Sequence, residues 1–148
     1  MSKIRVTKLF PFEMAHALWN YDGACRNVHG HSYVLYVTLT GTPVNDVDSP
    51  KNGMVVDFGD IKKIVNNLII KEFDHALVIS GFADYHNLKS DEQLFGKLKV
   101  VDFQPTVENL LIYFATLLKQ NLPETLFLNS LKLQETGTSY AEWFATDN

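Results

Sequence analysis

Two stretches near the start of the chain alternate between apolar and polar residues. In residues 3–16, one face carries Ile4, Val6, Lys8, Phe10, Phe12, Met14 and His16. In residues 29–41, one face carries His29, His31, Tyr33, Leu35, Val37 and Leu39. Alternation with a period of two is typical of a half-buried β-strand, so each stretch predicts a strand. Pro11 places an edge or a bulge in the first of them.

Two later stretches repeat apolar residues at helical spacing. The first follows Asp57, a good N-cap, with Asp60 placed to favour the start of a helix. Its apolar stripe consists of Ile61, Ile64, Val65, Leu68 and Ile69. The second begins at Thr106, which we expect to be its N-cap, and ends before Pro123. Each pattern predicts a helix with one buried face.

The remaining segments complete a simple order of elements. Residues 126–135 and about 140–145 read as two further strands, while residues 17–28 and 41–53 read as loops and 80–100 as an irregular excursion. The order is strand, strand, helix, helix, strand, strand. It predicts an α+β fold, with a four-stranded antiparallel sheet and two helices on one face. The two edges of such a sheet would be protected if subunits joined into a barrel.

Composition narrows the class of protein. The 148 residues predict a single domain spanning 1–148, and 46% hydrophobic with 20% charged residues is ordinary for a globular one. The single cysteine cannot form an internal disulfide, and a net charge of −4 without a basic cluster predicts no nucleic-acid partner. No apolar run approaches the roughly 20 residues of a membrane span, and residues 1–8 lack the core of a signal peptide. We therefore expect no membrane association and a cytoplasmic location.

A histidine pair opens the second predicted strand. His29 and His31 share one face, with Gly30 between them, and His16 ends the strand before. Three neutral imidazoles without a fourth protein ligand are typical of a catalytic zinc site, which keeps one position open. The alternative for His16 is a surface position at the end of its strand.

Cys25, four residues before this pair, allows several interpretations. It could be a fourth ligand, which would close the metal site and make the chain a structural-zinc binding module. It could instead stand beside the metal as a reactive thiol whose pKa the metal lowers, acting as a base or nucleophile. A buried, inert cysteine is the third possibility.

Two acidic positions add candidate chemistry. Asp74 directly precedes His75 after the first helix, where the pair could act as a proton relay or simply satisfy the last carbonyls of that helix. Glu135 lies near the end of a strand, where its carboxylate could accept two parallel N–H bonds from an amino-oxo-pyrimidine ring or be an ordinary surface charge.

Together these motifs resemble the 6-pyruvoyltetrahydropterin synthase / 6-carboxytetrahydropterin synthase family. The resemblance spans nearly the whole chain, and the spacing between Cys25 and His29 is similar to that of the bacterial 6-carboxy branch. The motifs are Phe12-x-x-Ala15-His16, Cys25-x3-His29-Gly30-His31, Asp74-His75, Pro105-Thr106-x-Glu108-Asn109 and Glu135-Thr136.

The resemblance implies a tunnelling fold, trimeric barrels stacked into a homohexamer, and active sites between subunits. His16, His29 and His31 would hold zinc. Cys25 would be the catalytic base, with Asp74 and His75. Glu135 and Thr106 would bind the substrate, 7,8-dihydroneopterin triphosphate, with Glu135 anchoring the pterin ring.

The product implied is 6-carboxytetrahydropterin, with release of triphosphate and acetaldehyde, for queuosine and other deazapurine pathways. The chain departs from the family after Asp74-His75, where Ala76-Leu77-Val78-Ile79 replaces the usual Leu-Asn continuation, and in the length of residues 80–100. A 6-pyruvoyl product therefore remains an alternative.

Overall fold

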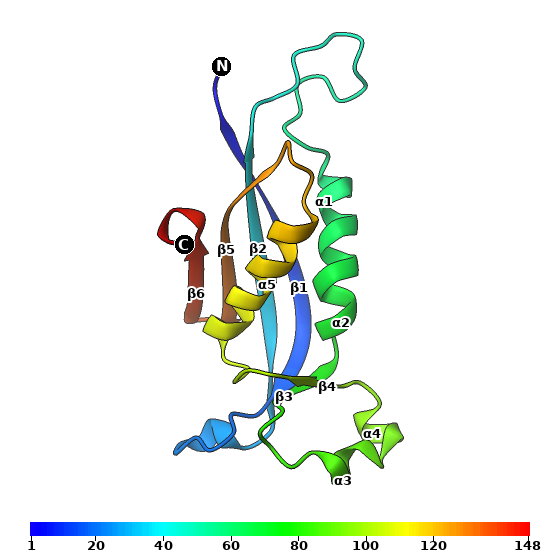
Figure 1. Ribbon diagram of the computed structural model, residues 1–148, viewed down its shortest axis with the longest axis vertical. Helices are drawn as coiled ribbons and strands as arrows, with labels where there is room; N and C mark the ends of the chain where they lie inside the picture. Colours follow the sequence, from blue (N-terminus) through cyan, green and yellow to red (C-terminus); the bar gives the residue numbers. More distant parts are fainter.

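The computed structural model describes all 148 residues and contains one six-stranded sheet in the order β4-β3-β1-β2-β5-β6. Long strands β1, β2 and β5 form its centre, and the short β3 and β4 extend one end (Figure 1). The strands are β1 (Ile4–His16), β2 (His29–Gly41), β3 (Ala76–Ser80), β4 (Leu98–Val101), β5 (Phe127–Thr136) and β6 (Ser139–Phe144).

The prediction of a four-stranded antiparallel sheet is wrong, because β3 and β4 add two parallel strands. β3 runs parallel to the end of β1, and β4 runs parallel to β3. All five residues of β3 are buried, so its sequence shows no alternation between faces. Part of the segment expected to be irregular, residues 80–100, is likewise ordered as the helices α3 (His86–Lys89) and α4 (Glu92–Phe95) and most of β4.

The first two predicted strands are confirmed and form a long hairpin. β1 and β2 pair antiparallel from Ile4 opposite Gly41 to His16 opposite His29. The loop between them contains a short 3-10 turn, η1 (Ala24–Arg26). This register brings the ends of the two strands that carry the histidines side by side.

Both predicted helices are confirmed, together with their caps. The first consists of α1 (Phe58–Val65), a π-helical turn η2 (Asn66–Ile70) and α2 (Lys71–Phe73), and Asp57 caps it by accepting from the Gly59 N–H. The second, α5 (Val107–Asn121), is capped by Thr106, whose hydroxyl oxygen accepts from the Asn109 N–H. A 3-10 turn, η3 (Ala145–Asp147), ends the chain.

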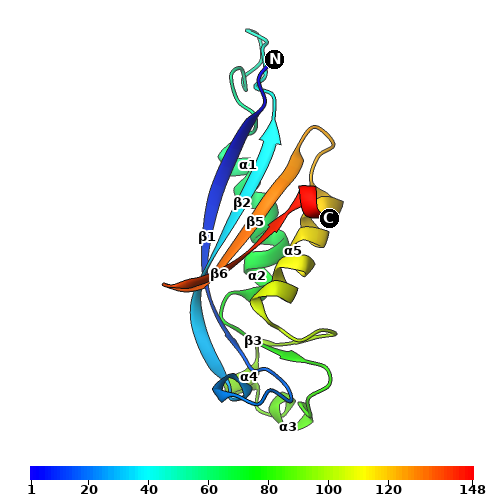
Figure 2. The same cartoon turned by 90° about the vertical axis from the view of Figure 1, so that its left-hand side faces the viewer.

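The two long helical segments cover the same face of the sheet, as predicted (Figure 2). The buried residues of β1, β2 and β5 largely alternate with more exposed ones and pack against the apolar stripes of the helices in one core cluster. None of the helices is both long enough and apolar enough to cross a lipid bilayer. At the histidine end of the hairpin, the His16 ring contacts the Pro105 carbonyl, two residues before α5 begins.

Candidate active site

Three histidines converge at the end of the β1–β2 hairpin. His16 is 2% exposed, while His29 and His31 are half-buried. One nitrogen atom from each ring lies within 4.8 Å of the others, an arrangement that could hold a metal ion. The alternation of the two strands places all three rings on the face that carries the core. The alternative of a surface position for His16 is therefore wrong.

Backbone carbonyls determine which ring nitrogen carries the proton in two of these histidines. The Nδ1 atom of His16 lies 2.7 Å from the carbonyl oxygen of Pro105, and that of His29 lies 2.7 Å from the carbonyl oxygen of Asn27. A carbonyl only accepts hydrogen bonds, so each Nδ1 carries a proton, and in the neutral ring Nε2 then presents a lone pair. In metal sites, a hydrogen bond from the ring nitrogen that does not bind the metal orients each histidine, and His16 and His29 both make such a bond.

The spacing of the rings fits a tetrahedral metal ion. The Nε2 atoms of His16 and His29 lie 3.1 Å apart. Zinc–nitrogen bonds of about 2.0–2.1 Å at tetrahedral angles place two ligand nitrogens roughly 3.3 Å apart. The His16–His29 pair therefore has the spacing of two zinc ligands, and His31, with a ring nitrogen within 4.8 Å of both, completes the three-imidazole donor set of a zinc site that retains an open position.

Burial favours the neutral, metal-binding form of His16. Desolvation lowers the pKa of its ring, and the neighbouring His29 and His31 act in the same direction, while the Pro105 carbonyl and Glu135 oppose them. A lower pKa means that a proton competes less with a metal ion for Nε2.

Glu135 points at the same cluster from β5. Its Oε1 atom lies 3.7 Å from Nε2 of His16 and 3.7 Å from Nε2 of His31. The Tyr33 hydroxyl donates a hydrogen bond to the same oxygen over 3.3 Å. Burial, reinforced by the Glu135 carboxylate, raises the pKa of Tyr33, so that hydroxyl remains a donor. The carboxylate is therefore oriented beside the three rings.

Cys25 lies in η1, half-buried, within the loop that joins the two histidine strands. Its sulfur atom is not a member of the close group of ligand atoms formed by the three histidines. Its carbonyl oxygen accepts from the Leu18 N–H over 2.9 Å, which closes the loop on itself. The geometry of the single chain thus favours the thiol outside the metal ligands over a closed four-ligand site.

Asp74 and His75 follow the first helical segment and meet β1. Asp74 Oδ1 accepts from the Glu13 N–H over 2.9 Å and lies 3.0 Å from Nδ1 of His75. The Glu13 N–H is the main cause of a lowered pKa of Asp74, with His75 and Lys97 adding to it. His75 has a φ of 61°, an unusual left-handed conformation for a non-glycine residue.

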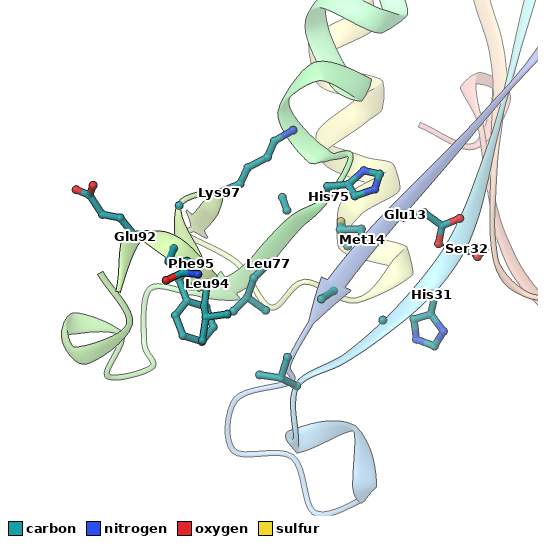
Figure 3. Close-up of a pocket in the computed structure, with 16 residues that line it drawn as sticks. Glu13, Met14, His31, Ser32, His75, Leu77, Glu92, Leu94, Phe95 and Lys97 are labelled. Carbon is teal, nitrogen blue, oxygen red and sulfur yellow. Dashed lines mark hydrogen bonds between the residues drawn. The ribbon is translucent and has the colours of Figure 1, made fainter. Parts of the chain in front are cut away.

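The His75 ring lines a cavity of about 670 Å³ between the hairpin and α4. His31, Glu13 and Lys97 also line it (Figure 3). No hydrogen bond or ion pair joins Cys25 to Asp74 or His75 within the chain. The three histidines and Glu135 are therefore assembled by one chain, whereas Cys25 has no hydrogen bond or ion pair with the Asp74–His75 pair.

Sequence reasoning missed three residues that support the site: Tyr33, Lys97 and Gln104. Tyr33 shares a strand face with His31, so the alternation pattern could have identified it. Lys97 and Gln104 act through contacts with backbone atoms of distant segments, for which the sequence carries no periodic signal.

The α+β sheet with a three-histidine cluster at its hairpin end defines a class of small proteins with a candidate metal centre. The chain belongs to the 6-pyruvoyl tetrahydropterin synthase family, whose model matches residues 5–145. It is 34% identical to a 6-carboxy-5,6,7,8-tetrahydropterin synthase of Haemophilus influenzae, over 94% of this chain and 97% of the relative. It is 35% identical to that of Aquifex aeolicus, over 95% and 98%. The predicted family is confirmed, and these names indicate an enzyme.

Solved structures support the same fold. A 6-pyruvoyl tetrahydropterin synthase from Caenorhabditis elegans superimposes with a TM-score of 0.68 at 26% identity, covering 98% of this chain and 97% of that one. A protein from Wolinella succinogenes gives a TM-score of 0.79 at 20% identity, covering 98% and 99%. The tunnelling fold is confirmed, with six strands in place of the predicted four.

Proposed function

We propose that the chain is a zinc-dependent 6-carboxy-5,6,7,8-tetrahydropterin synthase. It converts 7,8-dihydroneopterin triphosphate and one water molecule into 6-carboxytetrahydropterin, triphosphate and acetaldehyde. The 6-carboxytetrahydropterin is supplied to queuosine and other deazapurine pathways. The observation that carries the proposal is the group of three histidine nitrogens within 4.8 Å of one another. Relatives of that name, which match nearly the whole chain, support the choice of reaction.

His16, His29 and His31 hold the zinc ion in this proposal. Bound zinc supplies Lewis acidity toward the hydroxyl groups of the substrate side chain. The protein's part is to hold the three rings in a metal-binding orientation, which the carbonyls of Pro105 and Asn27 do for His16 and His29.

Cys25 and the Asp74-His75 pair move protons. The Cys25 thiolate removes a carbon-bound proton from the substrate side chain, and His75 returns a proton at another position. Asp74 holds the His75 ring through Nδ1, 3.0 Å away. The pterin ring is reduced at the expense of its own side chain, so the reaction needs no nicotinamide.

Glu135 and Thr106 bind the substrate. The Glu135 carboxylate accepts two parallel N–H bonds from the 2-amino-4-oxo-pyrimidine edge, oriented by the Tyr33 hydroxyl. The Thr106 oxygen accepts from the Asn109 N–H, which leaves its own O–H to donate to the ligand.

The active enzyme is a homohexamer of two stacked trimeric barrels in this proposal. β3 pairs with only Met14–His16 of β1, so the rest of β1 is an open edge of the sheet. β6 is the edge at the other side of the sheet. Joining such edges between subunits satisfies their backbone groups. It also offers a way to bring Asp74 and His75 of one subunit to Cys25 of another. Sedimentation velocity would give the mass of the assembly.

The test of the reaction is an anaerobic incubation of the zinc-loaded protein with 7,8-dihydroneopterin triphosphate, with products identified by mass spectrometry. We expect the mass of 6-carboxytetrahydropterin together with acetaldehyde. A 6-pyruvoyl product would instead support the second candidate, which the similarity to the Caenorhabditis elegans enzyme favours. Unchanged substrate from a folded, zinc-loaded protein contradicts both.

A further inference from the structure

The segment that leads into α5 touches two parts of the candidate site through consecutive residues. The Pro105 carbonyl accepts from Nδ1 of His16 over 2.7 Å. The residue before it, Gln104, reaches the loop between the histidine strands. Its Oε1 accepts from the Trp19 N–H over 2.9 Å, and its Nε2 donates to the Trp19 carbonyl over 2.7 Å. One short segment therefore contacts both His16 and the Cys25 loop.

The contact at Trp19 is one residue away from the link to Cys25. The Leu18 N–H donates to the Cys25 carbonyl over 2.9 Å, so the two ends of the loop are tied where Gln104 holds it. The centroid of the Trp19 ring also lies 5.9 Å from that of the Phe82 ring, which follows β3. The backbone at Trp19 is thus the point at which the body of the protein holds the Cys25 loop.

Gln104 is itself held in a fixed position by the helix start. Its carbonyl oxygen accepts from the Thr106 N–H over 2.8 Å and from Nδ2 of Asn109 over 2.9 Å. Thr106 caps α5, whose first turn is packed into the core. A side chain anchored on a rigid element orients its partner better than one on a free loop.

We propose that Gln104 is a positioning residue, which sets the place of Cys25 relative to the three-histidine cluster. This inference rests on the proposed function, in which Cys25 is the base. The side-chain amide offers a donor and an acceptor together and so pairs with both the N–H and the C=O of Trp19, as a neighbouring strand would. Proton transfer depends on placing the base within hydrogen-bond reach of its proton, so a looser loop lowers the rate.

The experiment compares zinc-loaded wild type with Gln104→Met, which keeps the length of the side chain and removes both hydrogen bonds. We expect kcat to fall roughly tenfold and KM to stay within about twofold. We also expect the rate of Cys25 alkylation by iodoacetamide to rise roughly fivefold, because the loop opens more often. Zinc content remains that of the wild type, since the Pro105 carbonyl still orients His16. The matched control is Gln120→Met, at an exposed glutamine near the end of α5.

A second variant covers the case in which Gln104→Met does not fold. Gln104→Glu keeps the acceptor for the Trp19 N–H but opposes the Trp19 carbonyl with a negative charge, so the same pattern is expected. A folded variant whose kcat and Cys25 alkylation rate both equal those of the wild type overturns the proposal. A variant that loses zinc as well as kcat also overturns it. If the wild-type protein itself shows no turnover, the proposed function is contradicted, but the role of Gln104 is not. The alkylation rate of Cys25 then tests that role: a faster rate in Gln104→Met than in wild type supports it, and an equal rate overturns it.

Discussion

The Nε2 atoms of His16 and His29 lie 3.1 Å apart, although the Nδ1 of each ring is committed to a backbone carbonyl. Two Nε2 lone pairs cannot form a hydrogen bond with each other. Burial lowers the pKa of His16, which works against a proton at this position. A cation bound by both rings would remove this conflict, as the proposed zinc site requires.

His16→Ala should therefore abolish stoichiometric zinc binding, weakening the affinity by more than about 100-fold, since even the residues that orient metal ligands contribute 10–100-fold. Zinc per chain is measured by elemental analysis after dialysis against a competing chelator. The control is His86→Ala, at the one histidine outside the candidate site, on α3. A His16→Ala protein that keeps one zinc ion per chain would show that the three-histidine cluster is not the metal site.

Much of this cluster follows from the sequence, because alternation and register decide it. His29 and His31 are two residues apart on a strand, and the hairpin pairs His16 with His29 directly. By contrast, β3 has no alternating pattern to read, since all its residues are buried between neighbours. The omission of β3, together with that of the four-residue β4, is the reason that the sheet was predicted with four strands.

Contacts between distant segments are the part that the sequence does not reveal. Gln104 and Trp19 are 85 positions apart, and Lys97 reaches the carbonyl of Asp74 from 23 positions away. Side-chain bonds to backbone atoms require no particular residue type at the other end. No pairing pattern along the chain can therefore predict them.

Asp74→Ala should lower the stability of the protein near neutral pH and have little effect in acid. The pKa of Asp74 is lowered below its usual value of 3.8, mainly by the Glu13 N–H, so its contribution is present above that value. It is lost as the pH falls through the folded-state pKa. More than a third of the side chain is exposed (37%), so we expect only about 0.5–1 kcal/mol at pH 7.

Urea unfolding of wild type and Asp74→Ala between pH 7 and pH 2.5 measures this difference. The gap between the two free energies of unfolding should close below about pH 3.8. Asp22→Ala, at an exposed aspartate of the Cys25 loop, is the control. A gap that stays constant across the range would mean that the charge of Asp74 contributes nothing.

Lys97→Met should loosen the end of the first helical segment. The Lys97 ammonium group donates to the carbonyls of Lys71, over 2.8 Å, and of Asp74. A cation at the C-terminus of a helix satisfies free carbonyls and is attracted by the negative end of the helix dipole. Because Lys97 is exposed, we expect a loss of only about 0.5–1 kcal/mol of stability. Amide exchange in residues 71–75 should be faster than in a Lys62→Met control, and equal rates would refute the anchoring role.

Cys25→Ala separates the catalytic from the structural interpretation of the single cysteine. The thiol lies outside the close group of histidine nitrogens, so removing it should leave zinc content and fold unchanged. Loss of a general base lowers turnover by roughly 100-fold to 10,000-fold. Steady-state product formation, zinc analysis and circular dichroism on the same sample measure the three quantities. Cys25→Ser should also be slow, because a hydroxyl is a far weaker acid than a thiol and supplies almost no anion at neutral pH. An alanine variant that loses zinc and unfolds would instead make Cys25 a fourth ligand of a structural site.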